Sequence, residues 1–430
     1  MLVMRYHMVI ICAVFMCAGT CADAAQDVQT LTWEDCVREA SRNNPDLVVA
    51  GESIYQARAS KAIAVSGVYP QLNASASGSE SKNKIDSEKT TTSDTYSYGL
   101  SGSLLIFDGL KSSNSIKAAA QNIVAAQESY FFSSSNIRQE LRSAFVNLLK
   151  AQDSITVTQD IAKIREDELK LITLRYKSGL EHKGSLMDNQ ASLTQAKFDL
   201  EQAIRNLALA QRQLNKAMGR KEFSPVKVRG DYLIKEDFHL ALDFKTLADN
   251  HPSVKQAVAK LHSADFSLRA TRGNFLPEVS VQAGAGRDGS DWPPVDSGLN
   301  VGLTVSMPIF EGGLRKAQLS QAESVLRQNE AQLRSTSDSV LLALEQAWES
   351  FREAGETVEA AKISLAANEE RAKIAEAQYS TGFITYDNWS IIDNNLVQSK
   401  KAYLNAQAGA LLAEAQWVSA KGVTLEYANQ

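Results

Sequence analysis

Two kinds of hydrophobic periodicity follow one another along the chain, and each occurs twice. Over residues 110–177 and again over 313–380, apolar side chains recur at alternating steps of four and three positions for many heptads. This pattern predicts two long coiled-coil-like helices, and neither stretch contains a proline that would interrupt them. At 1.5 Å per residue, each helix would extend about 100 Å, several times the width of a small globular domain.

A glycine and a second helical pattern follow each long helix. Gly179 and Gly382 stand just after the two predicted helices, and helical patterns rich in Ala, Leu, Gln and Lys resume over about 185–218 and 388–421. Glycine readily adopts the left-handed backbone conformation that ends many helices. Each glycine therefore predicts the tip of an antiparallel helical hairpin.

The period changes to two residues before each long helix. Apolar side chains alternate with small or polar ones over about 70–107 and about 277–310, which predicts a β-hairpin in each segment. The four strands are expected to be near membrane length, about 9–11 residues, with one apolar face. Strands of a soluble sandwich alternate in the same way. A sandwich needs more strands, however, so membrane strands are the favoured interpretation.

These elements recur at a nearly constant offset, which indicates a tandem duplication. The short stretch Phe-Asp-Gly at 107–109 returns 203 positions later as Phe-Glu-Gly at 310–312. The predicted strand–helix junctions are formed by Phe107, Asp108, Gly109, Phe310, Glu311 and Gly312. The predicted organisation is a signal peptide at 1–24, a first repeat at 25–218, an inter-repeat equatorial segment at 219–242, a second repeat at 243–422 and a C-terminal tail at 423–430.

The N-terminus carries the features of a secretory signal. Its apolar run, residues 8–18, is too short to span a bilayer as a helix, and an Ala-x-Ala site ends at Ala24. Lipidation of Cys21 is an alternative that its sequence context disfavours. Cleavage after Ala24 leaves Cys36 as the single cysteine, so an internal disulfide is excluded. We interpret Cys36 as a buried apolar residue of the first helix.

Composition and motifs exclude several classes of function. The 45 basic and 50 acidic residues nearly balance and form no block of like charge, which argues against nucleic acid as a partner. After the signal, no run of 18 apolar residues predicts a membrane helix. The stretch Gly-Ala-Gly-Arg-Asp-Gly at 284–289 matches a dinucleotide fingerprint, but the following Ser-Asp-Trp-Pro-Pro cannot begin the required helix. No cofactor, metal site or catalytic constellation is predicted, and the protein is not expected to be an enzyme.

Four membrane strands per chain have a consequence for assembly. A single-chain membrane barrel needs at least eight strands, and lipid does not tolerate an open sheet edge. Two copies would give an eight-stranded barrel filled by its own side chains, whereas three copies would give twelve strands and an open lumen. The small polar residues of the non-apolar face favour three copies.

The chain resembles the TolC-type outer-membrane channel-tunnel proteins, also called outer-membrane efflux proteins. The resemblance covers nearly all of the mature chain and rests on the duplication, the NNP and YP or LP markers, the strand-ending IFDG and PIFEGG, and the helix-reversing YKSGL and YSTGF. It implies a mixed fold, in which a homotrimer shares a twelve-stranded β-barrel in the outer membrane of a Gram-negative bacterium. Long helical hairpins would continue this barrel as an α-barrel across the periplasm.

The resemblance also implies a function and its site. The trimer would be the passive exit duct of a tripartite efflux or type I secretion system, docked to a periplasmic adaptor and an inner-membrane transporter. The expected docking residues at the tips are Gly179, Leu180, His182, Lys183, Gly382 and Phe383. Family members carry acidic gate residues six and nine places after the second tip glycine, where this chain has Asn388 and Ile391. The expected periplasmic gate is therefore Asp387, Asn388 and Asp393.

Two questions stay open at the level of sequence. A periplasmic coiled-coil scaffold or adaptor without a membrane pore would also contain long antiparallel helices, and it is the alternative function. The cargo, small toxic molecules or secreted proteins, and the class of inner-membrane transporter are not determined by these patterns.

Overall fold

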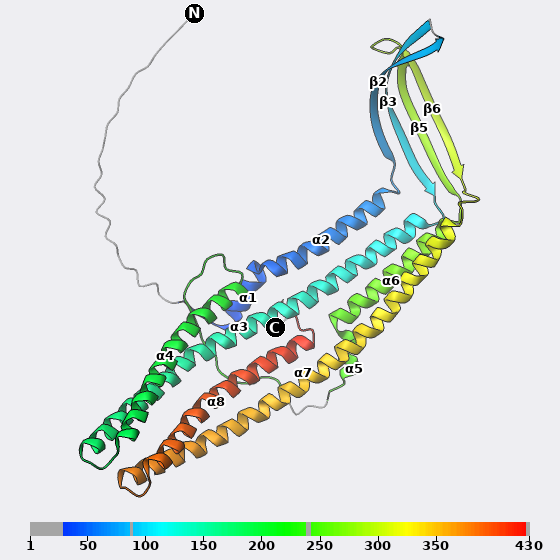
Figure 1. Ribbon diagram of the computed structural model, residues 1–430. Coiled ribbons are helices and arrows are strands. Elements are labelled where there is room, and N and C mark those ends of the chain that lie inside the picture. Colours follow the sequence, from blue (N-terminus) through cyan, green and yellow to red (C-terminus); the bar gives the residue numbers. More distant parts are fainter. Residues whose placement is uncertain (1–28, 87–88, 238–241, 427–430) are drawn as a thin grey trace, which may run out of the picture.

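The computed structural model describes residues 29–86, 89–237 and 242–426, so the predicted signal peptide and Cys21 lie outside the described residues. Figure 1 shows an elongated body with a β-sheet at one end and two helical hairpins at the other. Both repeats have the same order of elements. The first contains α1 (Trp33–Asn43), α2 (Pro45–Ser66), β2 (Gln71–Asp86), β3 (Lys89–Phe107), α3 (Lys111–Lys177) and α4 (Lys183–Ala217). The second contains α5 (Phe244–Asn250), α6 (Pro252–Gly273), β5 (Glu278–Gly289), β6 (Asp296–Ser306), α7 (Leu314–Ser380) and α8 (Tyr386–Ala420).

The helical region that begins each repeat is divided in two. Asn44 separates α1 from α2, and its Oδ1 accepts hydrogen bonds from the backbone of Asp46 (2.9 Å) and Leu47 (3.2 Å). His251 caps α6 in the equivalent place, with its Nδ1 accepting from Ser253. A proline follows each cap at the first helical position, where its missing N–H costs nothing. The NNP and NHP sequences are thus helix starts inside each repeat.

The four long strands form one antiparallel sheet in the order β2-β3-β5-β6. Its register aligns Ala74, Leu100, Ala285 and Leu299 across the four strands, so the apolar residues share one face. The opposite face carries the neighbouring small and polar residues, such as Ser101. The strands of the first repeat have 16 and 19 residues, longer than predicted, and those of the second have 12 and 11.

The largest core cluster lies halfway along the body, where α1, α3 and α4 meet. Cys36 is fully buried there, which confirms its interpretation as a core residue of the first helix. Burial raises the pKa of its thiol to about 12, with smaller contributions from nearby Glu39 and Asp35. A neutral thiol in this position behaves as a small apolar side chain.

The segment between the repeats adds a strand that the hydrophobic pattern did not predict. β4 (Val226–Val228) pairs in parallel with β1 (Gln29–Leu31) at the N-terminal end of the described chain. The described part of the predicted C-terminal tail also packs against the body, because Leu425 is buried and its backbone N–H donates to the Ser134 hydroxyl. Among the described residues, no helix combines the length and the apolar character needed to cross a bilayer.

Candidate functional site

The tips of the two hairpins are built by the same backbone turn. Gly179 and Gly382 follow α3 and α7 with φ of +74° and +81°. At each tip the residue after the glycine donates its N–H to a carbonyl five residues earlier, Leu180 to Arg175 at 2.9 Å and Phe383 to Gln378 at 2.8 Å. This is the Schellman motif, which satisfies the last carbonyls of a helix. The predicted reversals at both glycines are therefore present.

The tip glycines are required by conformation and not by crowding. A Cβ added to either residue would meet no atom of the chain within 4 Å. We expect Gly179→Val and Gly382→Val to cost about 1–2 kcal/mol or more, because a β-branched residue resists positive φ. Each variant should reach the outer membrane yet lose export, which membrane fractionation and a susceptibility assay would measure. Gly51→Val, in open space within α2, is the matched control. Wild-type export in both tip variants would contradict a special role for these turns.

The expected docking residues lie together at the tips. Leu180 and Phe383 expose 68% and 84% of their surface, although both are large and apolar. His182 is also exposed, and its Nδ1 caps α4 by accepting a hydrogen bond from the Ser185 backbone (3.2 Å). Lys183 is the first residue of α4. The structure thus brings the predicted tip residues of each hairpin to one end of the molecule, and their docking role stays a prediction.

Two tyrosines tie one hairpin to the other just behind the tips. The Tyr379 hydroxyl donates to the Glu181 carboxylate at 2.7 Å, and the Tyr386 hydroxyl donates to Asp188 at 2.6 Å. Burial opposes ionisation of Glu181, but the hydrogen bonds from Tyr379, His182 and Ser185 hold its pKa below the usual value. Burial and the nearby carboxylates raise the pKa of both tyrosines. The hydroxyls therefore stay protonated as donors at neutral pH.

An aromatic and cationic stack fills the space between these links. The rings of Tyr379 and Trp389 are parallel within 5° with centroids 4.6 Å apart. The Arg175 guanidinium also lies over the Tyr379 ring, 4.6 Å from its centroid. Such stacked and cation–π contacts add to the stability of area burial alone. The tip of the second hairpin is thereby packed against α3 of the first.

Farther from the tips, one buried arginine joins α3 to α8. Arg165 contacts Asp393 at 2.5 Å and Glu168 at 2.8 Å, and it donates to the Asn394 side chain at 2.7 Å. Asp393 Oδ2 is buried and accepts no hydrogen bond from a described residue, and its charge is balanced by the ion pair with Arg165. Removing one member of such a network leaves a buried charge uncompensated.

This position of Asp393 corrects the expectation drawn for the gate. Asp393 was expected to reach toward a tunnel axis, but only 6% of its surface is exposed, and Arg165 binds its carboxylate inside the chain. The sequence did not predict this burial, because the pattern of residues on α8 does not show which face packs against α3. An aspartate on a helix is also usually exposed. Asp387 and Asn388, in the first turn of α8, remain exposed.

Glu168 has an unusual protonation equilibrium. Burial and the neighbouring Asp393 raise its pKa from 4.5 to about 7, although Arg165 acts in the opposite direction. The residue also lines a cavity of about 480 Å³ between α3, α7 and α8. The charged groups around this cavity are Asp167, Glu168, Asp393, Glu369, Glu376 and Lys373.

The raised pKa predicts a pH-dependent contact between α3 and α8. A carboxyl group whose pKa is higher in the folded state than in the unfolded state stabilises the fold most below pH 4.5, and this contribution is lost as pH rises toward 7. We expect Glu168→Gln to remove this loss, so that the variant is the more stable protein above pH 7. Thermal unfolding from pH 4 to 8 would measure this difference, with Glu370→Gln, at an exposed position of α7 that does not line the cavity, as control. Parallel pH profiles for wild type and Glu168→Gln would contradict the prediction.

The strand–helix junctions differ between the repeats in their surroundings. At the first junction, Asp108 accepts hydrogen bonds from the backbone (2.7 Å) and hydroxyl of Ser112 at the start of α3. Gly109 has φ of +70°, and an added Cβ would lie 2.6 Å from the Gly273 carbonyl oxygen at the end of α6. The backbone of the two repeats is thus in close contact here.

The second junction is open within the chain. Phe310 exposes 87% of its surface, against 40% for Phe107. Gly312 has φ of +59° with no atom near an added Cβ, and Glu311 forms an ion pair with Arg315 at 2.8 Å. Residues of both junctions nevertheless line one cavity of about 330 Å³. The paired junctions are therefore neighbours at the base of the sheet.

Several residues of these sites were not identified from sequence. Arg165, Glu168, Glu181 and Tyr379 were not singled out, because a charged or aromatic residue on a long helix or at its turn usually has a solvated or packing role. The feature of the sequence that could have identified these residues is their position within about one to four helical turns of the tip glycines. The pairing partners are about 200 positions away in the sequence, so periodicity alone could not connect them.

Sequence comparison links the chain to known proteins. The family profile described as "Outer membrane efflux protein" matches residues 36–220 and 244–423. The Outer membrane efflux protein BepC of Brucella suis biovar 1 (strain 1330) is 24% identical over 353 residues, which cover 79% of this chain and 72% of BepC. The Cation efflux system protein CusC of Escherichia coli (strain K12) is 23% identical over 421 residues, covering 93% of this chain and 90% of CusC.

Solved structures share the fold. A membrane protein from Pseudomonas aeruginosa superimposes with a TM-score of 0.82 at 20% identity, covering 90% of this chain and 93% of that protein. The CmeC outer membrane channel of Campylobacter jejuni gives a TM-score of 0.81 at 18% identity, covering 90% and 85%. The resemblance inferred from the repeated motifs is confirmed. Because the family profile covers most of both repeats, this chain belongs to the outer membrane efflux protein family.

Proposed function

We propose that three copies of this outer-membrane efflux protein assemble into one channel that acts as the passive exit duct of an efflux system. The observation that carries this proposal is the four-stranded sheet, whose apolar face is exposed along the whole of β6. On that strand Leu299 and Val301 expose 81% and 74% of their surface. An exposed apolar face of this extent is typical of strands that contact lipid.

The free edges of the sheet support the number of copies. β2 and β6 each pair with a neighbour on one side only, and lipid does not tolerate unpaired backbone groups. Pairing β6 of one chain with β2 of the next would remove both edges. Three chains would then give a twelve-stranded barrel, whose inner face carries small residues such as Ser101, Gly284 and Asn300. The helices α3, α4, α7 and α8 would continue it as an α-barrel.

Cysteine cross-linking tests this assembly. Apart from buried Cys36, the described chain has no cysteine, so pairs placed on β2 and β6 report on contacts between chains. We expect a panel of such pairs to give covalent trimers on denaturing gels after mild oxidation. The pair Gly102→Cys and Ala283→Cys, opposite each other on β3 and β5 of one chain, is the control and should leave the mass unchanged. A monodisperse monomer that keeps its sheet in detergent would overturn the trimer.

The helical tips are the proposed contact with the rest of the export system. Leu180 and Phe383 are exposed apolar residues at turns, and such residues mark partner-binding surfaces. We place a periplasmic adaptor protein at the tips, together with His182 and Lys183, and an inner-membrane transporter beyond it. Leu180→Ser with Phe383→Ser should weaken adaptor cross-linking while leaving the channel in the outer membrane. Unchanged cross-linking would move the docking surface elsewhere.

The proposed gate now rests on Asp387 with Asn388. Three copies of an exposed carboxylate near a narrow axis would attract cations and repel anions. Single-channel recording should therefore show weaker cation selectivity for Asp387→Ala, whereas the buried Asp393 should affect stability first. Equal selectivity in wild type and Asp387→Ala would remove this residue from the gate.

Export itself is tested in a strain that lacks its own channel. Expression of this protein with its partner genes should restore resistance to members of a panel of metal ions, dyes and antibiotics. Tip variants that reach the outer membrane serve as controls for transport. A protein recovered from the soluble periplasm without detergent would instead favour a coiled-coil scaffold.

A further inference from the structure

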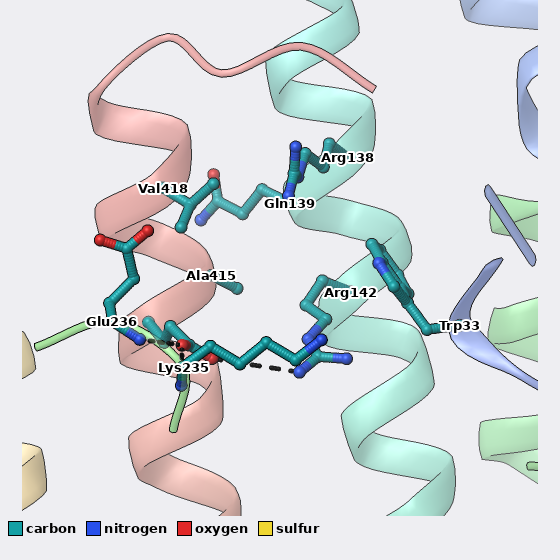
Figure 2. A pocket seen from close by; sticks show the side chains of 9 residues that line it. Trp33, Arg138, Gln139, Arg142, Lys235, Glu236, Ala415 and Val418 are labelled. Carbon is teal, nitrogen blue, oxygen red and sulfur yellow. Dashed lines mark hydrogen bonds and ion pairs between the residues drawn. The ribbon is translucent and has the colours of Figure 1, made fainter. Parts of the chain in front are cut away.

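Another polar cavity lies at mid-length, away from the tips and from the sheet. Its volume is about 130 Å³, and it is lined by residues of α1, α3, α8 and the segment between the repeats. The cationic side chains around it are Arg138, Arg142 and Lys235, and Figure 2 shows them with Trp33 and Glu236. A cavity needs only about 10–15 Å³ to hold one water molecule, so this cavity has room for a small polyatomic ion.

Arg142 is a largely buried cation of this cavity with few polar partners. Its guanidinium lies over the Trp33 ring, 5.1 Å from the centroid, and only 18% of the side chain is exposed. Its one ion contact within the described chain is Glu414 at 4.0 Å, and no described residue accepts a hydrogen bond from it. Burial lowers its pKa, against the opposing effect of Glu414, Asp231 and Glu34. The Arg142 N–H groups are open to solvent at the cavity, where an oxyanion would find charged donors for its oxygens.

The carboxylates beside the cavity are already engaged. Oε1 of Glu414 accepts the backbone N–H groups of Lys235 (2.7 Å) and Glu236 (3.0 Å). The Glu236 carboxylate forms an ion pair with Lys421 at 2.8 Å. The ammonium group of Lys235 has no ion pair among the described residues. Arg138 donates to the carbonyl of Thr424 at 3.0 Å and forms no close ion pair among the described residues, although Glu236 and Glu414 lie near enough to favour its charged form.

We propose that this equatorial cavity binds a small oxyanion of the chemical class of inorganic phosphate or sulfate, held by Arg142, Arg138 and Lys235. The planar guanidinium can bind two oxygens of such an ion side by side. The position at mid-length favours a free ion over a lipid headgroup, because the exposed apolar face of the sheet lies at the far end of the molecule (Figure 1). The bound ion would link α3, α8 and the segment between the repeats.

Equilibrium dialysis of the full mature chain in detergent tests the proposal, with labelled inorganic phosphate as probe and chloride to hold ionic strength constant. We expect saturable binding of one phosphate per chain, and competition by sulfate. Loss of one charged donor in Arg142→Met or Lys235→Met should weaken binding at least about tenfold. Phosphate should also raise the unfolding temperature of wild type.

The control is Lys227→Met, which removes an exposed lysine from β4 in the same region and should leave phosphate affinity unchanged. Lys235→Met keeps the backbone hydrogen bond to Glu414 and is therefore expected to fold. If Arg142→Met does not fold, the phosphate affinity of Lys235→Met tests the proposal. The absence of saturable phosphate binding to wild type would overturn the proposal. Equal affinity in wild type and Lys235→Met would do the same.

Discussion

Replacing Arg165 with methionine is expected to separate α3 from α8 and to destabilise the protein by about 3–5 kcal/mol. Among the described residues, Arg165 is the one cation that pairs with both Asp393 and Glu168, and all three side chains are nearly inaccessible to water. Methionine fills a similar volume but leaves two buried carboxylates facing each other. Thermal unfolding and hydrogen exchange along α3 and α8 would measure the loss.

A charge-free combination separates this effect from simple loss of packing. The triple variant Arg165→Met, Glu168→Gln, Asp393→Asn contains no buried charge at this site, and it should recover much of the stability. Arg334→Met, on an exposed position of α7, is the matched control and should change stability by less than about 0.5 kcal/mol. If Arg165→Met behaves like Arg334→Met, the network does not hold the helices together.

The second large effect is expected from Gly109→Ala at the first strand–helix junction. The new Cβ would lie 2.6 Å from the Gly273 carbonyl oxygen and 2.7 Å from Leu276 Cβ, and the backbone already has positive φ. Strain and overpacking together should cost about 2–5 kcal/mol, because backbone atoms cannot move aside as a flexible side chain can. Reduced yield in the outer membrane and a lower unfolding temperature would report it.

The second repeat supplies the control for this prediction. Gly312→Ala changes the equivalent residue at φ of +59°, but its Cβ would enter open space within the chain. It should therefore show the conformational cost alone, about 1–2 kcal/mol. Equal losses for Gly109→Ala and Gly312→Ala would mean that contact with α6 contributes nothing.

Much of the architecture follows from short-range pattern. The long helices were expected at 110–177 and 313–380 and run from Lys111 to Lys177 and from Leu314 to Ser380. Such elements are predictable because a heptad pattern, a period of two and a glycine with positive φ are all local properties of the chain. The apolar face of the sheet was predictable for the same reason, since alternation assigns a side chain to a face before any strand is paired.

Other features depend on which distant segments meet. Gly219 illustrates this, because an added Cβ would lie 2.3 Å from the Asn43 carbonyl oxygen, whereas the similar tip glycine Gly179 has open space around it. Both glycines end a helix with positive φ and look alike in sequence. Because α1 packs against the end of α4, position 219 has no room for a side chain, whereas position 179 does.

Local periodicity and repeated motifs were enough to predict the duplication, the two hairpin tips, the four alternating strands and the family resemblance, although the strands of the first repeat are longer than predicted. Only the packed fold shows that Asp393 is buried against Arg165, that β4 pairs with β1, and that Arg142 lines a cavity at mid-length. The reason is physical. Burial and charge pairing depend on contacts between residues that can lie 291 positions apart, as Ser134 and Leu425 do, and those contacts exist only once the long helices have packed in register.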